Sequence, residues 1–228
     1  MKKPIALFDI DNTMYEGFSY FELLKKHVSE QLIAADVLDT ALGSMQQYKS
    51  GARDYEATII TLLDIYAAGL KGADYDLVLR STKEFYENSS KFFDYVAPTI
   101  ARLRTSHDVA LVTGEPQFVA EAVGALFEIT SYYSTQYQVI DGHFTGITAH
   151  YLASRHEKLD AIKHLTQGHQ QENSFAFGDS EGDIEMLRAV QYPICLNPTD
   201  GLRDVAEKEN WYLPKTNEVE ALIAKLSV

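Results

Sequence analysis

The sequence predicts an α/β protein built on a doubly wound parallel sheet, with an all-helical segment inserted after the first strand. Short, continuously apolar runs alternate with helical patterns over most of the chain. Such runs are typical of strands buried on both faces of a parallel sheet. A long stretch without any strand signal follows the first run. We therefore expect two structural parts, a sheet with flanking helices and a helical insertion.

The apolar runs mark the expected strands of a Rossmann-like core. They lie at residues 5–8, 109–112, 175–177 and 192–196, with a weaker run at 131–134. Helical patterns lie at residues 97–105, 117–127, 155–165, 184–190 and 202–208, with another near the carboxyl end. Asp141 and Gly142 separate residues 137–140 from 143–148. Because Asp-Gly suits a two-residue turn, this segment predicts a β-hairpin.

Residues 15–92 interrupt the alternation of strand and helix. Their apolar side chains recur every three or four positions, as in the stripe formed by Tyr55, Ile59, Leu62, Leu63 and Tyr66. The stretch is far longer than the roughly dozen residues that a parallel crossover needs. We expect a cap domain at residues 15–92 and a discontinuous core at residues 1–14 and 93–228. Hinges are predicted near residues 14–17 and 92–94.

Composition excludes several functional classes. Lys and Arg total 20 against 33 Asp and Glu, so the net charge is -13, and no basic run exceeds two residues. Binding to a phosphate backbone needs clustered cations, so we expect no nucleic-acid partner. No apolar run is long enough to cross a bilayer, so no membrane segment is expected. Cys195 is the single cysteine, which favours a reducing compartment and a cytoplasmic protein.

Two acidic pairs directly follow predicted strands. Asp9 and Asp11 come after residues 5–8, and Asp179 and Asp183 come after residues 175–177. One such pair alone is usually a loop or a helix cap. Ligands of open α/β sheets bind at the carboxyl ends of the strands, and four carboxylates meeting there would repel one another without a divalent cation. Oxygen ligands of this kind suit Mg²⁺.

Two further segments can supply a phosphate site. Thr113 and Gly114 also end a predicted strand, and Ser154 and Glu157 fit a capping box that places Lys158 in the first turn of a helix. A lysine there opposes the helix dipole and by itself indicates a solvated surface residue. Beside an acidic metal site it becomes a candidate phosphate ligand.

Together these residues resemble the four motifs of the haloacid dehalogenase-like superfamily, in the expected order. The motifs are Asp9-x-Asp11-x-Thr13, Thr113, Lys158 and Gly178-Asp179-x-x-x-Asp183. The helical insertion resembles that superfamily's first cap type, and residues 141–146 resemble its phosphoserine-phosphatase-like branch. The resemblance implies a Mg²⁺-dependent phosphomonoesterase that hydrolyses a small phosphorylated metabolite through an aspartyl-phosphate.

The resemblance also implies a role for each motif residue. Asp9 would be the nucleophile and a metal ligand, together with Asp179 and the backbone carbonyl of Asp11. The Asp11 side chain would protonate the leaving oxygen and later deprotonate water. A halide needs no proton, so an acid at this position favours phosphoryl transfer over carbon–halogen cleavage.

The remaining motif residues would bind the phosphoryl group. Thr113, Gly114 and Lys158 would hold its oxygens. Asp183 would act from behind them and orient Lys158 or a metal-bound water.

The chain departs from phosphoserine phosphatases around the substrate. Position 18 is Phe where a Glu is usual, Glu16 and Arg53 do not fall at the expected positions, and Gly182 replaces a common Asn. These departures argue against phosphoserine as the substrate. The aromatic residues near the first motif, Tyr15, Phe18, Tyr20 and Phe21, either pack the cap helices or, as a hypothesis, face an apolar or cationic leaving group.

Three alternatives to a phosphatase remain open at this level. A phosphotransferase or mutase would pass the phosphoryl group from Asp9 to a hydroxyl. A regulatory module would keep the phospho-aspartate without turnover. A binding protein could retain the fold after losing its activity. The oligomeric state is not predicted by the sequence.

Overall fold

The computed structural model describes residues 2–152 and 155–226, and within them it contains a six-stranded sheet in the order β4-β3-β2-β1-β5-β6. The strands are β1 (Pro4–Phe8), β2 (Asp108–Pro116), β3 (Ser131–Ile140), β4 (His143–His150), β5 (Gln170–Gly178) and β6 (Tyr192–Cys195). Neighbouring strands are parallel except for β3 and β4. The predicted α/β class is therefore confirmed, with an antiparallel edge strand added by the hairpin.

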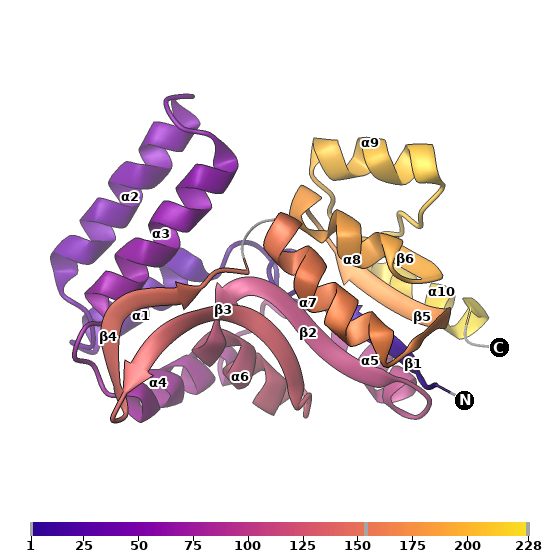
Figure 1. The fold of residues 1–228 in the computed structure, drawn as a ribbon, viewed down its shortest axis with the longest axis horizontal. Coiled ribbons are helices and arrows are strands. Elements are labelled where there is room, and N and C mark those ends of the chain that lie inside the picture. The colour runs from indigo at the N-terminus through magenta and orange to yellow at the C-terminus, as the bar shows by residue number, and fades with distance from the viewer. Residues whose placement is uncertain (1, 153–154, 227–228) are drawn as a thin grey trace.

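Helices cover both faces of this sheet (Figure 1). Those outside the insertion are α5 (Val96–Arg104), α6 (Gln117–Leu126), α7 (Arg155–Gln167), α8 (Ile184–Arg188), α9 (Asp200–Glu209) and α10 (Val219–Leu226). Side chains of α7, α8 and α9 share one buried cluster, and those of α5, α6 and α10 share another. No helix in the described ranges is long and apolar enough to span a membrane.

β1 lies in the interior of the sheet, and burial of both its faces explains why its sequence is apolar. Ala6 and Phe8 pack into one of the two clusters, while Ile5 and Leu7 pack into the other. Side chains alternate between the two faces of a strand, so a strand covered on both sides must be apolar throughout. β1 pairs with β2 and β5. The segments that follow these three strands therefore leave the sheet at one edge.

The hairpin is longer than the sequence pattern indicated. β3 is one strand, which joins the weak run at residues 131–134 to the predicted hairpin strand at 137–140. Asp141 and Gly142 form the turn with φ values of 50° and 78°. Positive φ at both positions is what a type I′ turn requires, so the predicted hairpin is confirmed.

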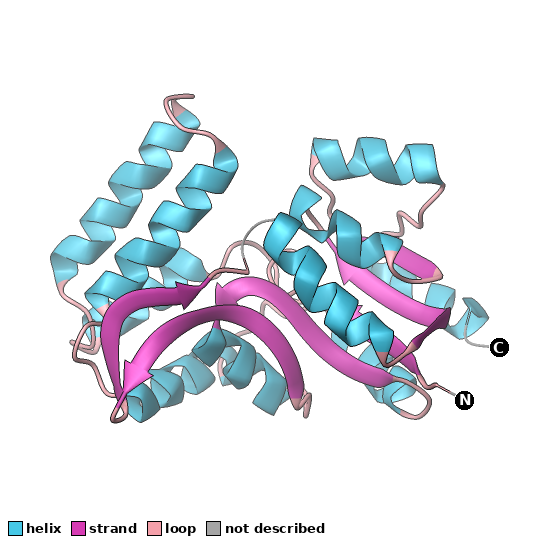
Figure 2. Ribbon diagram, in the orientation of Figure 1, coloured by secondary structure: helices cyan, strands magenta, loops and turns pink. Residues whose placement is uncertain are grey.

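The regular elements between β1 and α5 are all helices. They are α1 (Tyr20–Ser29), α2 (Ala35–Lys49), α3 (Tyr55–Gly69) and α4 (Tyr75–Glu87). Asp54 and Asp74 cap α3 and α4 by accepting from the N–H groups of Ala57 at 2.8 Å and Leu77 at 3.0 Å. In Figure 2, α2 and α3 stand as a pair, α3 packs against β4 at the edge of the sheet, and α4 lies beside α6.

The helical insertion is tied to the sheet at more than its two ends. Where the chain enters and leaves, the N–H of Glu16 donates to the carbonyl of Lys91 at 2.8 Å. Further along, the N–H of Gly72 donates to Phe144 O at 2.8 Å and the N–H of Phe144 donates to Ala73 O at 3.0 Å. A rigid rotation about the two predicted hinges would have to break this second set of bonds as well.

Candidate active site

Three carboxylates meet at the carboxyl edge of the sheet. Asp9 directly follows β1, and Asp179 and Asp183 follow β5. Ligand atoms of the three lie within 4.8 Å of one another. The N–H of Asp9 donates to Phe177 O at 3.0 Å, so pairing of β1 with β5 sets their separation. The structure thus brings together the two acidic segments that the sequence placed at neighbouring strand ends.

Lys158 lies within this acidic cluster and is only 4% exposed. Its Nζ is 2.7 Å from Asp183 Oδ1 and 3.3 Å from Asp9 Oδ1. Burial alone would lower the pKa of Lys158, but Asp183 and Asp9 outweigh it and the pKa is raised. The ammonium therefore stays charged. The predicted capping box of Ser154 and Glu157 lies outside the described side chains.

Asp183 is fully buried and all its bonds are internal. Its Oδ2 accepts from the N–H groups of Asp179 and Ser180, both at 3.1 Å, and from Ser180 Oγ at 3.2 Å. A Cβ on Gly178 would lie 2.6 Å from Asp183 Cβ, so a side chain there would displace the carboxylate. Asp183 thus holds the loop after β5 and contacts Lys158; that it orients Lys158 or a metal-bound water stays a prediction.

The cluster carries more negative charge than Lys158 can compensate. Burial raises the pKa of Asp9 to about 7, with Lys158 acting against it and Asp183 adding to it. Burial, Asp183 and Asp9 also raise the pKa of Asp179 well above its usual range. A divalent cation would remove this repulsion, and carboxylate oxygens are the donors that Mg²⁺ prefers. The donor set therefore fits the predicted metal.

Thr113 and Gly114 lie on the neighbouring strand at the same edge. β2 continues to Pro116, beyond its predicted end, and its pairing with β3 is irregular between Val112 and Pro116. Thr113 Oγ1 accepts from the N–H of Glu115 at 3.2 Å. Its hydroxyl hydrogen remains available to donate, as a phosphoryl oxygen requires.

The Asp11 side chain is not part of the acidic cluster. Its Oδ2 accepts from the N–H of Ser19 at 3.0 Å, and its Oδ1 accepts from no described residue. Burial raises the pKa of Asp11 well above its usual range, and the charge of Glu115 raises it further. The two aspartates of the first motif therefore face different surroundings: Asp9 contacts a lysine, and Asp11 lies beside another acid.

Glu115 is a site residue that the sequence analysis missed. It is 7% exposed, and burial followed by the charge of Asp9 raises its pKa to about 7. The predicted strand ended at residue 112, so Glu115 was assigned to no element. Had β2 been extended, alternation would have placed Glu115 on the same side as Thr113. Leu111, two residues before Thr113, packs in the cluster shared with the inserted helices.

The prediction that Tyr55 packs in the apolar stripe of α3 is wrong. Its side chain is 54% exposed. It begins α3, one turn before the part of the stripe that is buried, and its ring lies 5.8 Å from that of Tyr48. Burial of the hydroxyl, followed by the charges of Asp179 and Asp9, raises the pKa of Tyr55. The sequence pattern alone gave no signal of this proximity.

The aromatic residues near the first motif are mostly packing residues. Tyr15 and Tyr20 are each 1% exposed, whereas Phe18 is 36% exposed. Phe18 stacks on Tyr20 with 5.6 Å between ring centroids. Tyr15 and Tyr20 therefore have no free surface, whereas Phe18 and its half-buried neighbour Phe21 do. An aromatic contact to the leaving group stays a hypothesis for Phe18 and Phe21.

Two departures from the phosphoserine phosphatase pattern also have a structural setting. Nη1 of Arg53 donates to Thr61 Oγ1 at 2.8 Å and to Ser44 Oγ at 3.2 Å, which ties this side chain to the helical insertion. A Cβ on Gly182 would lie 4.0 Å from the Nζ of Lys158. The glycine therefore leaves the ammonium less covered than a larger residue would.

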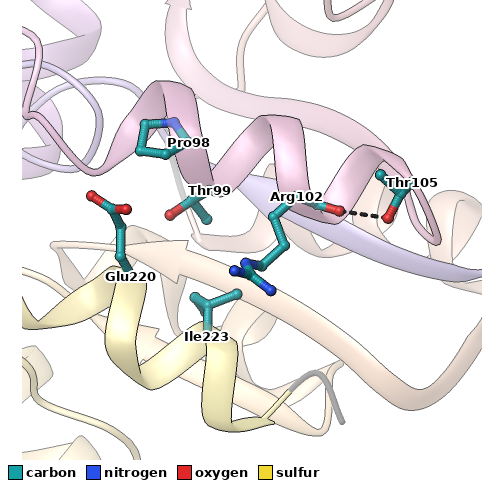
Figure 3. A pocket seen from close by; sticks show the side chains of 6 residues that line it. All are labelled: Pro98, Thr99, Arg102, Thr105, Glu220 and Ile223. Atoms are coloured by element: carbon teal, nitrogen blue, oxygen red, sulfur yellow. Dashed lines mark hydrogen bonds between the residues drawn. The ribbon is translucent and has the colours of Figure 1, made fainter.

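A cavity of about 390 Å³ lies elsewhere, between α5 and α10 (Figure 3). It is lined by Pro98, Thr99, Arg102, Thr105, Glu220 and Ile223. No residue of the four motifs lines it. The acidic edge of the sheet, where those motifs converge, is therefore the candidate active site.

This chain is similar to several known proteins. A histidinol-phosphatase of Neisseria meningitidis is 27% identical over 92% of this chain and 97% of its own length. A Bordetella pertussis protein of unknown function has the same fold, with a TM-score of 0.75, 22% identity, and coverage of 95% of this chain and all of its own. A phosphoserine phosphatase solved as a phospho-aspartyl intermediate analogue has a TM-score of 0.64, with 19% identity and 90% and 91% coverage.

A family model gives the most direct result. The model described as haloacid dehalogenase-like hydrolase matches residues 6–188, which contain all four motifs. This confirms the superfamily and the enzyme class predicted from the motifs, and the relatives named as phosphatases agree with the phosphatase assignment. The chain belongs to the haloacid dehalogenase-like hydrolase family.

Proposed function

We propose that this protein is a Mg²⁺-dependent phosphomonoesterase that hydrolyses a small phosphorylated metabolite through a phosphoryl group carried on Asp9. The observation that supports it best is the contrast between the first-motif aspartates. Asp9 lies 3.3 Å from the ammonium of Lys158, whereas Asp11 has no described cation beside it and has a raised pKa. The first suits a nucleophile, and the second suits an acid that gives up a proton.

In the first step a carboxylate oxygen of Asp9 attacks phosphorus, and the bond from phosphorus to the ester oxygen breaks. Lys158, the Thr113 hydroxyl and the Gly114 N–H hold the phosphoryl oxygens and offset their charge. Asp11 transfers its proton to the departing alkoxide. In the second step Asp11 takes a proton from water, which attacks phosphorus and releases inorganic phosphate from Asp9.

Asp9, Asp179 and the backbone carbonyl of Asp11 would hold the metal. When bound, Mg²⁺ supplies positive charge that lets an anionic carboxylate approach an anionic ester. The excess of buried carboxylates over lysine supports this assignment. Asp183 is left out because its oxygens are occupied by Lys158, Ser180 and the backbone of Asp179.

We also propose that residues 15–92 act as a cap domain above a core of residues 1–14 and 93–228, and that the protein works in the cytoplasm. The exposed ring of Tyr55 and its closeness to Asp179 support a cap that reaches the substrate. The regulatory-module alternative is disfavoured, because such modules carry the phosphorylated Asp on a later strand and have no helical insertion. The family match to hydrolases also disfavours it.

The test is a screen of phosphorylated metabolites with Mg²⁺, including histidinol phosphate and phosphoserine because relatives are named for them. We expect release of inorganic phosphate from at least one ester without any acceptor alcohol, and none from the Asp9→Asn variant. Formation of a new phosphate ester from an added alcohol, with no release of inorganic phosphate, would instead identify a phosphotransferase.

A further inference from the structure

The Thr99 hydroxyl is a buried polar group without a partner in the described part of the chain. Its side chain is 1% exposed, and Oγ1 forms no hydrogen bond with any described residue. Five other helical threonine hydroxyls donate to the carbonyl four residues earlier; they belong to Thr40, Thr58, Thr61, Thr82 and Thr166. Because buried polar groups are almost always paired, a partner from outside the described residues is indicated.

Thr99 lines the cavity between α5 and α10, which is separate from the candidate active site. In Figure 3 the Thr99 oxygen points away from its own helix, toward the space between the two helices. The volume of about 390 Å³ lies within the range of about 300–1,000 Å³ that is typical of small-molecule sites. The unpaired hydroxyl therefore faces a space that is large enough for a small ligand.

Two opposite charges extend into this cavity from its two walls. Arg102 reaches from α5 toward α10, and Glu220 reaches from α10 toward α5, with Thr99 between them (Figure 3). Among the described residues neither side chain has an ion-pair partner, and the two do not pair with each other. Their places in the last turn of α5 and the first turn of α10 suit the helix dipoles. The dipoles do not explain the open space between two unpaired charges.

The rest of the lining limits the chemistry of a ligand. Pro98 and Ile223 are apolar, and Thr105 Oγ1 already donates to Arg102 O at 2.8 Å. The side-chain groups left for a ligand are one cation, one anion and the Thr99 hydroxyl, which can both donate and accept. A ligand with a single charge would meet one opposite charge and one like charge. A zwitterion would meet an opposite charge at each end.

We propose that the cavity between α5 and α10 is a second ligand site, which binds a free α-amino acid with an apolar side chain. The carboxylate of the ligand pairs with Arg102 and its ammonium pairs with Glu220. The Thr99 hydroxyl accepts from the ammonium and donates to the carboxylate, so its missing partners are supplied. Pro98 and Ile223 contact the apolar side chain of the ligand. This inference goes beyond the proposed phosphatase function and does not depend on it.

Isothermal titration calorimetry with matched probes tests the ligand class. The probes are L-valine, L-leucine and L-methionine, each beside the amine that lacks its carboxylate and the acid that lacks its ammonium. At least one amino acid should bind about tenfold or more tightly than either of its two partners, because each partner loses one charge-assisted contact. Equal binding of the amine or the acid, or no binding of any of these amino acids, would overturn the proposal.

Variants of the lining test whether the amino acid binds in this cavity. Arg102→Met and Glu220→Gln should each weaken its binding by about 10–100-fold, and Thr99→Val by about 2–10-fold. Both charged side chains are exposed, so these two variants should melt at the same temperature as the parent. Arg203→Met and Glu207→Gln, which change exposed side chains of α9, are the controls and should bind like the parent. Unchanged binding in either charged variant, or equal losses in the controls, would contradict the site.

The Asp9→Asn variant separates this inference from the proposed function. Calorimetry needs no turnover, and no residue of the four motifs lines the cavity. Asp9→Asn should therefore bind the amino acid with the same Kd as the parent, with or without Mg²⁺. That result supports the second site even if the parent hydrolyses no phosphate ester. Weaker binding in Asp9→Asn, or binding that requires Mg²⁺, would locate the amino acid at the acidic edge of the sheet and overturn the inference even in an active phosphatase.

Discussion

Two buried groups of carboxylates lie at the carboxyl edge of one sheet, and they differ in what compensates them. Asp9, Asp179 and Asp183 surround the ammonium of Lys158. Asp11 and Glu115 face each other with no described cation. Identical functional groups thus acquire different chemistry from their neighbours. The first group suits attack and metal binding, and the second suits holding a proton.

The largest expected effect lies in the first group. Asp9→Asn should reduce kcat by about 10⁴-fold or more, because the amide cannot attack phosphorus. The fold should persist, since the substitution removes a buried charge without changing the shape. Steady-state phosphate release checks this, with Asp108→Asn as the control because Asp108 is half-exposed and pairs with Lys3. Activity of Asp9→Asn within tenfold of the parent would falsify the assignment.

Removing the cation should make the first group resemble the second. Lys158→Met leaves Asp9 and Asp183 buried without their partner and should lower the free energy of unfolding by about 3–5 kcal/mol. Lys163→Met is the control on the same helix; its side chain is 58% exposed and the change should be within about 0.5 kcal/mol. Urea denaturation in EDTA measures both, and equal stability of the two variants would contradict the buried pair.

In the second group, the effect of Asp11 on kcat/KM should depend on whether the leaving group needs a proton. Asp11→Asn should lower kcat/KM for an alkyl phosphate by about 10²–10⁴-fold. For p-nitrophenyl phosphate kcat/KM should fall far less, because nitrophenolate leaves unprotonated, although kcat should still fall since water activation also uses Asp11. Stopped assays on both esters provide the comparison. A uniform loss in kcat/KM would show that Asp11 does not protonate the leaving oxygen.

The smallest expected effect is a pH-dependent difference in stability. The pKa of Glu115 is about 7 in the folded protein, above its ordinary value of 4.5. Between these values the folded chain holds a proton that the unfolded chain releases, so this group lowers stability as pH rises from 4.5 to 7. Glu115→Gln removes the effect. Its stability relative to the parent should rise by on the order of 1–3 kcal/mol across that window and then level off.

His27 makes the difference measurement necessary. Burial lowers its pKa from 6.5 to about 4, so the unfolded chain binds the extra proton and stability falls as pH drops through that range. This contribution is the same in parent and variant and cancels. Denaturation in EDTA from pH 5 to pH 8 gives the curve. A flat difference between the two proteins would show that Glu115 titrates normally in the fold.

The positions of the strands and the meeting of the four motifs at one sheet edge were predictable, because both depend on residues close together in the sequence. Residues 5–8 are apolar on both faces, so β1 had to be central, and acids after two parallel strands had to meet at one edge. The Asp141-Gly142 turn was predictable for the same reason. Each of these signals lies within a few residues of the feature it predicts.

What escaped prediction depends on contacts between distant segments. Glu115 is significant only because Asp11, far away in sequence, lies beside it, and Tyr55 only because α3 begins near Asp179. The hinge prediction likewise treated the insertion as joined by its ends. The bonds from Gly72 and Ala73 to Phe144 form only once β3 and β4 fold under α3 and α4. The periodicity of apolar residues carries no information on contacts between segments that are distant in the sequence.

Trapping the phosphoryl group tests most directly whether Asp9 carries it. The Asp11→Asn variant should form the phosphorylated species from p-nitrophenyl phosphate but release it slowly, because water activation is impaired. After an acid quench, mass spectrometry of peptides should show about one phosphoryl group per chain, on Asp9, and none when Asp9→Asn is added. A phosphoryl group on another residue, or none while phosphate is still released, would contradict the mechanism.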